Sequence, residues 1–221
     1  MLPEYPLSLG TARSAIRELF EYGKQRAAVV GPENVFDFSI GNPSVPPPEC
    51  VNATIKKLVD TVDPVLLHGY TSSQGDPEAR RLIAENLNAR FGSSYSADNL
   101  FMTVGAAASL CCCFYGLANK GDEIIVLSPY FPEYTVFLKG AGIRPIIVPA
   151  DTESFQINFD ILERSITEKT AAVLINSPNN PSGVVYSEDT LRRLSKILQE
   201  KSEQYSRPIY LISDEPYREI S

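Results

Sequence analysis

Short apolar segments alternate with segments of helical spacing over the second half of the chain, and this alternation constrains the fold more than any other feature. Five of the apolar segments have the length and composition of strands: Leu100–Val104, Glu123–Leu127, Ile143–Val148, Ala171–Ile175 and Ile209–Ile212. The segments between them have helical character: Gly105–Leu117, Pro132–Gly140, Phe159–Ile166 and Glu188–Lys201. This order predicts an α/β fold with a mostly parallel sheet and flanking helices.

The first hundred residues predict mainly helices. Apolar residues recur at helical spacing from Thr11 to Val30, where a Gly-Pro pair is a stop signal. Val35–Ile40 has the pattern of a short strand, and a proline-rich stretch after it opens a helix that runs to about Val62. We expect a further helix over residues 77–91, with Asp76 as its N-cap and Gly92 at its end.

Charge and hydropathy argue against two classes of partner. The formal net charge of −7 disfavours nucleic acid, whose recognition needs concentrated Lys and Arg. No apolar run approaches the roughly 20 residues of a membrane helix, and the N-terminus lacks the basic start and apolar stretch of a signal peptide. We therefore expect a cytoplasmic protein with neither a membrane nor a nucleic-acid partner.

Histidine and cysteine usage argues against a metal site. The single histidine, His68, rules out a zinc site built on several histidines and suits a surface or interface position. Three of the four cysteines are consecutive, Cys111 to Cys113, and no C-x-x-C spacing exists. We interpret them as packing thiols in a reduced compartment.

Ligands of open α/β sheets bind beyond the carboxyl ends of the strands, so the segments after the strands are the candidate site. Thr103–Ser109 leads into a glycine and small residues that start a helix, whose free backbone N–H groups suit a phosphate. A tight turn that merely needs small residues is the alternative. Ser128–Tyr134 holds three aromatic residues, which form either a wall of a flat pocket or ordinary core.

Two further segments of this kind are polar. Asn176–Gly183 combines two X-Pro steps with three asparagines and a glycine. It is either a stiff loop that aims the Asn180 amide at a ligand or a surface turn. Ser213–Tyr217 follows an apolar strand, and the carboxylate of Asp214 there needs a cation, several donors, or a helix N-terminus to cap.

Taken in order, these segments resemble the fold-type I pyridoxal phosphate (PLP) enzymes, specifically the class I/II aminotransferases. The pair N-N-P-S-G at Asn179–Gly183 and D-E-P-Y at Asp214–Tyr217 carries the resemblance most strongly. G-N-P at Gly41–Pro43 and H-G-Y-T…G-D-P-E-A-R at His68–Arg80 match earlier landmarks of the family. The resemblance covers essentially the whole chain and implies the aminotransferase-like PLP-dependent transferase fold.

The resemblance also implies a role for individual residues. Asp214 would pair with the pyridine nitrogen and keep it protonated, which makes the ring an electron sink. Tyr217 and Asn180 would donate hydrogen bonds to the phenolic oxygen of PLP. Phe131 would stack on the ring, with Tyr130 as the alternative. The remaining expected contacts are the backbone N–H groups of Gly105, Ala106 and Ala107 with the phosphate, Gly41 near the substrate carboxylate, and Tyr70 with the phosphate of a neighbouring subunit in a homodimer.

The same resemblance places part of the machinery outside the sequence given. The Schiff-base lysine is expected after the D-x-x-Y segment, beyond Ser221, so no catalytic residue is assigned within the chain. We expect residues 1–45 to form an N-terminal arm and part of a small domain. Residues 46–221 would form a large PLP-binding domain that is incomplete at its C-terminus. The chain is thus expected to be an N-terminal fragment, inactive as given.

Four readings of function follow. The first is an aminotransferase that moves an amino group between an amino acid and a 2-oxo acid. The second is a PLP-dependent carbon–sulfur lyase of the same fold, and the third is a non-enzymatic PLP-binding regulatory domain. No basic helix-turn-helix segment precedes the domain, which disfavours the third. A truncated gene product without activity is the fourth.

Overall fold

The computed structural model describes residues 3–11, 15–39, 41 and 45–220, with only the backbone described at residues 15 and 16. The chain divides into two compact units, Met1–Tyr70 and Thr71–Ser221. This division falls at a different place from the expected domain boundary after residue 45. That boundary concerns the domains of a whole enzyme and stays a prediction.

The first unit is helical. Its elements are α1 (Glu4–Thr11), α2 (Ala15–Val30), η1 (Pro32–Asn34), α3 (Glu49–Thr61) and α4 (Pro64–Leu67). The helices predicted up to Val30 and Val62 are confirmed. No described residue of this unit is buried, so its described part has no core of its own.

The strand predicted at Val35–Ile40 is wrong for the residues described. Val35 to Ser39 form no strand, and the side chains of Phe36 and Phe38 are almost fully exposed. A strand needs a neighbour to accept and donate its backbone hydrogen bonds. No described segment of this unit provides one. Ile40 itself lies outside the described residues.

The second unit holds the alternating elements. They are α5 (Pro77–Phe91), η2 (Ala97–Asn99), α6 (Ala106–Leu117), β1 (Glu123–Ser128), α7 (Glu133–Gly140), β2 (Arg144–Pro149), α8 (Phe159–Ser165), β3 (Thr170–Asn176), α9 (Glu188–Tyr205), β4 (Tyr210–Asp214) and η3 (Arg218–Ile220). Strands β1 to β4 form one parallel sheet in the order β2-β1-β3-β4. The predicted α/β fold with a parallel sheet and flanking helices is confirmed.

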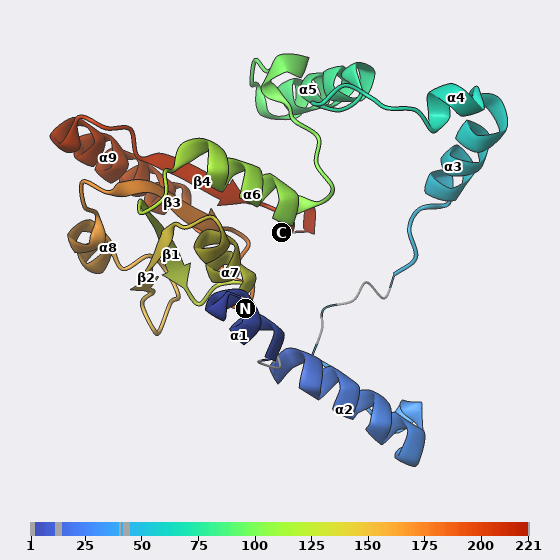
Figure 1. Ribbon diagram of the computed structural model, residues 1–221, viewed down its shortest axis with the longest axis horizontal. Helices are drawn as coiled ribbons and strands as arrows, with labels where there is room; N and C mark the ends of the chain where they lie inside the picture. Colours follow the sequence, from blue (N-terminus) through green and yellow to red (C-terminus); the bar gives the residue numbers. More distant parts are fainter. Residues whose placement is uncertain (1–2, 12–14, 40, 42–44, 221) are drawn as a thin grey trace. The chain divides into compact units, whose positions relative to one another are not determined.

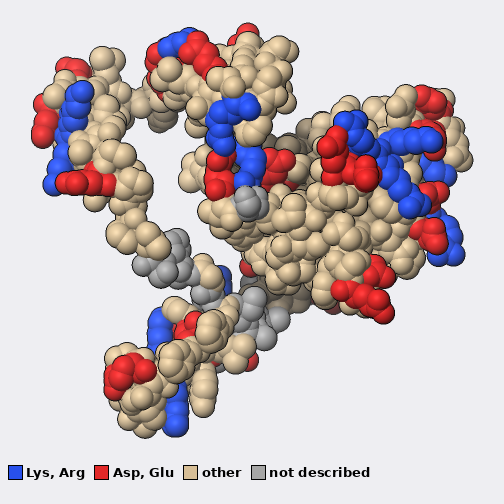
Figure 2. All heavy atoms as spheres, turned by 180° about the vertical axis from the view of Figure 1, so that it is seen from behind, with Lys and Arg blue, Asp and Glu red and all other residues tan. Residues whose placement is uncertain are grey.

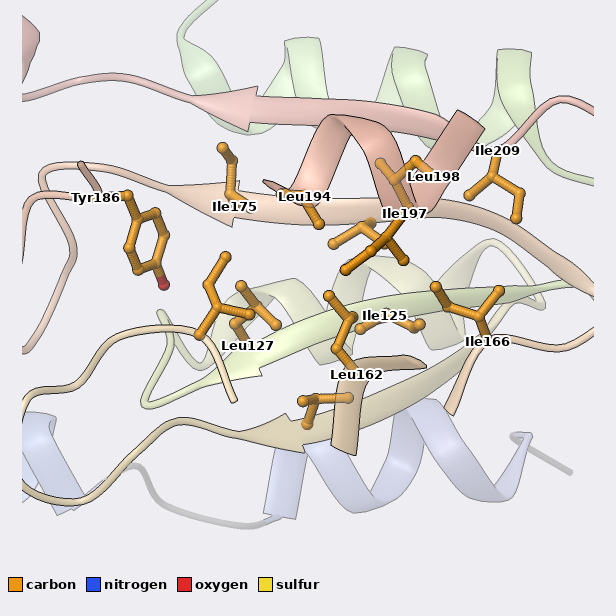
Figure 3. Close-up of a cluster of buried hydrophobic side chains, with 13 residues drawn as sticks. Ile125, Leu127, Leu162, Ile166, Ile175, Tyr186, Leu194, Ile197, Leu198 and Ile209 are labelled. Carbon is orange, nitrogen blue, oxygen red and sulfur yellow. The ribbon is translucent and has the colours of Figure 1, made fainter. Parts of the chain in front are cut away.

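Alternate residues of the strands supply two separate cores, one on each face of the sheet. On one face Ile124, Val126 and Leu174 pack with residues of α6 and α7, such as Phe114 and Leu138. On the other face Ile125, Leu127, Val173 and Ile175 pack against α8 and α9. Figure 3 shows this second cluster, and Figure 1 shows the two pairs of helices on opposite faces. Because β1 and β3 are covered on both sides, they are continuous apolar runs rather than alternating ones.

The predicted ends of α5 are confirmed. The Asp76 side chain accepts a hydrogen bond from the Ala79 N–H at 2.8 Å, and Pro77 occupies the first helical turn. Gly92 closes the helix with a left-handed conformation at φ 65°, where a side chain would be strained.

The strand predicted at Leu100–Val104 is wrong. No residue of this segment lies in a strand. The backbone bonds it makes to other described segments run from the Leu100 N–H to Ala97 O in η2, at 3.2 Å, and from the Met102 N–H to Gln74 O, at 2.9 Å. Val104 is almost fully exposed. Extended conformation becomes a strand only where a neighbouring strand pairs along it, and the sheet of the described residues ends at β2 and β4.

Charged side chains of both signs are interspersed over the surface of the second unit on the face shown in Figure 2. Within the described ranges no helix combines the length and the hydropathy that crossing a membrane requires. The described residues also contain no group of three or more His, Cys, Asp or Glu side chains arranged to hold a metal ion.

Asp122 and Arg207 form an ion pair at the amino-terminal edge of the sheet. The guanidinium donates to the Asp122 carboxylate, with one contact at 3.1 Å, and to the carbonyl of Glu168. Arg207 holds the pKa of the Asp122 carboxyl below its usual value, against burial, which raises it. A lowered pKa in the folded state stabilises the fold above about pH 4, the unfolded value. This contribution is lost as the pH falls through the folded pKa.

Arg207→Met is therefore expected to lower the free energy of unfolding by about 1 kcal/mol at neutral pH. It should also weaken the dependence of stability on pH below about 4. Urea unfolding at pH 7 and in mild acid measures both effects. Arg192→Met is the matched control, because Arg192 pairs with Glu188 on the exposed face of α9 and such pairs contribute little. Equal pH dependence in the wild type and Arg207→Met would contradict the assignment.

Candidate functional site

A cavity of about 240 Å³ lies where the segments after β1, β3 and β4 meet the start of α6. Its size is close to the lower end of small-molecule sites, about 300 Å³ upward. Six of the eight residues predicted to bind the cofactor line it: Ala106, Ala107, Phe131, Asn180, Asp214 and Tyr217. The structure thus brings together residues that are up to 111 positions apart, from Ala106 to Tyr217.

The other predicted site residues lie elsewhere. Gly105 does not line the cavity, but it is the N-cap of α6 and precedes the two alanines that do. Gly41 and Tyr70 belong to the first unit, where both are exposed, and their expected contacts with substrate and with a neighbouring subunit stay predictions. Tyr130 does not line the cavity and packs instead against the core on the α6 side of the sheet.

The start of α6 offers two open backbone donors to the cavity. Ala106 and Ala107 occupy the first two positions of a 12-residue helix, where N–H groups have no acceptor within the helix. The next two N–H groups, of Ala108 and Ser109, are already directed to the Gly105 carbonyl at 3.2 and 3.4 Å. Gly105 makes this entry possible with φ 84° and ψ 164°. Open donors together with the positive end of the helix dipole suit an anion such as a phosphate.

Two aromatic rings form one wall of the cavity. Phe131 lies just before α7 and Tyr134 lies in its first turn, and both line the cavity. Their ring centroids are 5.5 Å apart with the planes at 79°, the edge-to-face arrangement that aromatic pairs prefer. The Tyr134 ring is almost completely buried and anchors the wall in the core.

Asp214 ends β4, and its carboxylate faces the same cavity. The partner that a half-buried carboxylate needs is the Tyr134 hydroxyl, which donates a hydrogen bond to Oδ2. Burial, and then the hydrogen bond and negative charge of Asp214, raise the pKa of Tyr134 far above its usual value. The hydroxyl therefore stays protonated and acts as a donor. Sequence reasoning placed Tyr134 in the aromatic segment but gave it no role; its signal was its position in the first turn of a helix, three residues after Phe131.

Tyr134→Phe is expected to lower the free energy of unfolding by about 1.5 kcal/mol, because hydrogen bonds to charged groups contribute roughly that much. Urea denaturation of the two proteins measures the difference. Tyr115→Phe is the control, since Tyr115 lies on α6 with an exposed side chain. A Tyr134→Phe protein as stable as the control would show that the Tyr134–Asp214 contact does not stabilise the fold.

The loop after β3 has both a structural and a ligand-facing asparagine. Asn179 is buried, and its Oδ1 accepts hydrogen bonds from the Ser182 N–H at 3.0 Å and the Ser182 hydroxyl at 2.7 Å. Its neighbour Asn180 lines the cavity. In the described part of the chain, the side chains of Asn180 and Tyr217 have no hydrogen-bond partner. Both therefore present unused polar groups to a ligand.

A second cavity of about 380 Å³ adjoins the first and shares Asn180 and Tyr217 with it. Its other walls are mostly apolar and include Val185 and Ile220. Asn180 and Tyr217 thus lie on the wall that the two cavities share.

Comparison with known proteins agrees with the fold. The sequence model of the family described as aminotransferase class I and II matches residues 33–221. The probable aspartate/prephenate aminotransferase of Aquifex aeolicus is 33% identical over 186 residues, which cover 83% of this chain and 44% of that protein. The aspartate aminotransferase of Pyrococcus horikoshii is 33% identical over 210 residues, or 93% of this chain and 49% of that protein.

Solved structures give the same result. An amino transferase from Eubacterium rectale has 61% sequence identity and a TM-score of 0.96, over 100% of this chain and 56% of that one. The chain belongs to the aminotransferase class I and II family, and the family depends on PLP, as the sequence led us to expect. The chain spans about half the length of the curated relatives it matches.

The residues of the cavity fit this cofactor. PLP is a flat, phosphorylated pyridine, and the cavity offers an aromatic wall, a carboxylate, two open side-chain donors and two open backbone N–H groups. Each of these groups matches one feature of the ligand: the ring face, the ring nitrogen, the phenolic oxygen and the phosphate.

Proposed function

We propose that this chain provides the cofactor cavity of an aminotransferase that moves an amino group between an amino acid and a 2-oxo acid. The observation that carries the proposal is the convergence of Asp214, Asn180, Tyr217 and the start of α6 on one cavity. The names of relatives support amino transfer over carbon–sulfur cleavage. They include aspartate/prephenate, N-acetyl-LL-diaminopimelate and alanine aminotransferases, which differ in substrate and share the transfer.

Each residue has one task in this proposal. The Ala106 and Ala107 N–H groups, with Gly105 shaping the turn, bind the phosphate and fix one end of the ligand. Phe131 covers one face of the ring and excludes water from it. Asn180 and Tyr217 donate hydrogen bonds to the phenolic oxygen. Asp214 holds a proton on the pyridine nitrogen, and Tyr134 fixes the orientation of its carboxylate.

When bound, a protonated pyridine ring supplies an electron sink for the carbanion that forms at the α-carbon of an amino acid. The negative charge of Asp214 favours the protonated ring because an opposite charge within about 4–6 Å stabilises the charged form. A carboxylate at the end of β4 therefore sets the electronic state of the cofactor, while the other residues set its position.

The partner proposed from Tyr70 is a second copy of the protein. In similar enzymes this tyrosine reaches the phosphate of the neighbouring subunit, and Tyr70 is fully exposed at the end of the first unit. A homodimer would use that exposed side chain. The cytoplasmic location expected from the sequence likewise stays a proposal.

Calorimetric binding of pyridoxamine 5'-phosphate to the 221-residue chain tests the proposal. This probe carries the ring and the phosphate but no aldehyde, so it does not react with surface lysines. We expect saturable binding at one site. Pyridoxamine without the phosphate should bind about tenfold or more weakly, because it loses charge-assisted bonds to the start of α6.

Two outcomes would contradict the proposal. One is the absence of binding by a chain that unfolds cooperatively, and the other is equal affinity for the ligands with and without phosphate. In a protein of the relatives' full length that contains this chain, amino transfer should convert an amino acid into the 2-oxo acid of the same carbon skeleton and pass its amino group to a second 2-oxo acid. A lyase would instead cleave the side chain and release ammonia without needing the second 2-oxo acid.

A further inference from the structure

Asn176 is a buried polar residue that the proposed function does not use. It is the last residue of β3, and its register partner in the parallel ladder is Asp214, the last residue of β4. Its side chain lines the cavity, yet only 4% of the residue is exposed. A buried amide at the rim of a ligand site needs either a ligand or protein partners for its donor and its acceptor.

Both ends of the Asn176 amide are engaged by backbone groups. Its Nδ2 donates to the Asp214 carbonyl at 2.9 Å, and its Oδ1 accepts from the Asn180 N–H at 2.6 Å. One side chain therefore connects the backbone of the residue expected at the ring nitrogen to that of the residue expected at the phenolic oxygen. Those two residues belong to different loops, and the sheet ladder stops at Asn176 and Asp214.

We propose that Asn176 is a positioning residue. It fixes the Asn180 backbone relative to that of Asp214, so that the side chains of both residues contact the same ligand. The expected effect of Asn176 on ligand affinity rests on the proposed function. The two hydrogen bonds by which Asn176 connects the backbones of Asn180 and Asp214 do not. Asparagine suits the position because its amide offers a donor and an acceptor on a short side chain. Alanine loses both bonds, while aspartate keeps an acceptor for the Asn180 N–H and loses the donor to Asp214.

Hydrogen exchange measured by NMR on the full 221-residue chain tests the connection directly. In Asn176→Ala the amide of Asn180 should exchange about tenfold faster or more, because its acceptor is gone. The amides of Val126 and Leu174, inside the sheet, should exchange as in the wild type. In Asn176→Asp the Asn180 amide should remain protected. Unchanged exchange at Asn180 in Asn176→Ala would overturn the proposal.

Affinity for pyridoxamine 5'-phosphate gives the functional readout on the same proteins. We expect both Asn176 variants to bind about tenfold or more weakly than the wild type, since a misplaced Asn180 or Asp214 loses its bond to the ligand. Asn158→Ala is the matched control: it removes an asparagine that caps α8, costs about 1 kcal/mol of stability, and should leave affinity unchanged. Wild-type affinity in Asn176→Ala would also overturn the positioning role.

The two readouts separate this inference from the proposed function. A wild-type chain that does not bind the probe contradicts the proposed function, while the exchange rate of the Asn180 amide still decides whether Asn176 makes the connection. Circular dichroism and urea unfolding identify a variant that fails to fold. In that case Asn176→Asp, which keeps one of the two bonds, is the deciding variant. Its Asn180 amide should exchange as slowly as in the wild type, while its affinity for the probe should fall. Fast exchange of that amide, or wild-type affinity, would contradict the positioning role of Asn176.

Discussion

Asp214→Ala should weaken the binding of pyridoxamine 5'-phosphate at neutral pH by about 100-fold. Removing one partner of a buried charge pair costs roughly 3–5 kcal/mol, and the lower end applies because Asp214 is only half-buried. In a protein of the relatives' length, the same change should lower the rate of amino transfer by a similar factor. Each tenfold decrease in rate corresponds to an activation free energy that is higher by about 1.4 kcal/mol. Calorimetry on the 221-residue chain measures the first effect.

Two further variants show whether the charge itself is responsible. Asp214→Asn keeps an oxygen that accepts from the Tyr134 hydroxyl, so it should unfold at nearly the wild-type urea concentration and still bind the ligand weakly. Asp189→Ala removes an exposed carboxylate in the first turn of α9 and should bind like the wild type. Near-normal affinity in Asp214→Asn would show that the carboxylate is not paired with a protonated ring.

Gly105→Ala should weaken binding of the phosphorylated ligand by about tenfold or more. The new Cβ meets no atom within 4 Å, so the cost is not a clash. It comes from φ 84°, where a residue other than glycine bears roughly 1–3 kcal/mol of strain. Relief of that strain turns the first peptides of α6 and moves the Ala106 and Ala107 N–H groups away from the cavity. Calorimetry with the phosphorylated and unphosphorylated ligands measures the effect, and only the first should lose affinity.

Gly116→Ala provides the control on the same helix. Gly116 lies near the end of α6, its added Cβ also meets nothing within 4 Å, and its φ is not in the left-handed region. Alanine there should stabilise the helix by about 0.5–1 kcal/mol and leave binding unchanged. Equal losses of affinity in the two alanine variants would rule out a specific role for the Gly105 conformation.

The elements that the sequence predicted best are those whose ends or burial depend on residues within the element itself or directly beside it. Asp76 and Gly92 mark the two ends of α5 by capping chemistry that depends only on neighbouring residues. The runs that became β1 and β3 are apolar on both faces, because helices cover the sheet on both sides. Cap residues and continuous apolar runs were therefore sufficient to place these elements.

The two wrong strands share a physical cause. Apolar residues typical of strands occur in Val35–Ser39 and in Leu100–Val104. A strand, however, also needs a second segment elsewhere in the chain to pair with. Sequence pattern reports the tendency to extend and says nothing of the partner. The second segment still had a consequence for the site, since it leads into Gly105 and the start of α6.

The sequence predicted which strand ends form the site, but not the hydrogen bonds that connect its residues. Asp214 ends β4 and Asn180 follows β3, its parallel neighbour, so both lie at the carboxyl edge of the sheet. Tyr134 and Asn176 were missed because their roles are contacts between elements: a hydroxyl from α7 to Asp214, and an amide between two loops. Such partners depend on packing and register, which a local motif does not contain.

A crystal structure of the 221-residue chain with pyridoxamine 5'-phosphate would show whether the ligand binds in the cavity between α6 and Asp214. We expect the phosphate at the Ala106 and Ala107 N–H groups, and the ring beside Phe131 with its nitrogen against the Asp214 carboxylate. A ligand bound in the second cavity, beyond Asn180 and Tyr217, or one whose phosphate lies away from the start of α6, would contradict this arrangement.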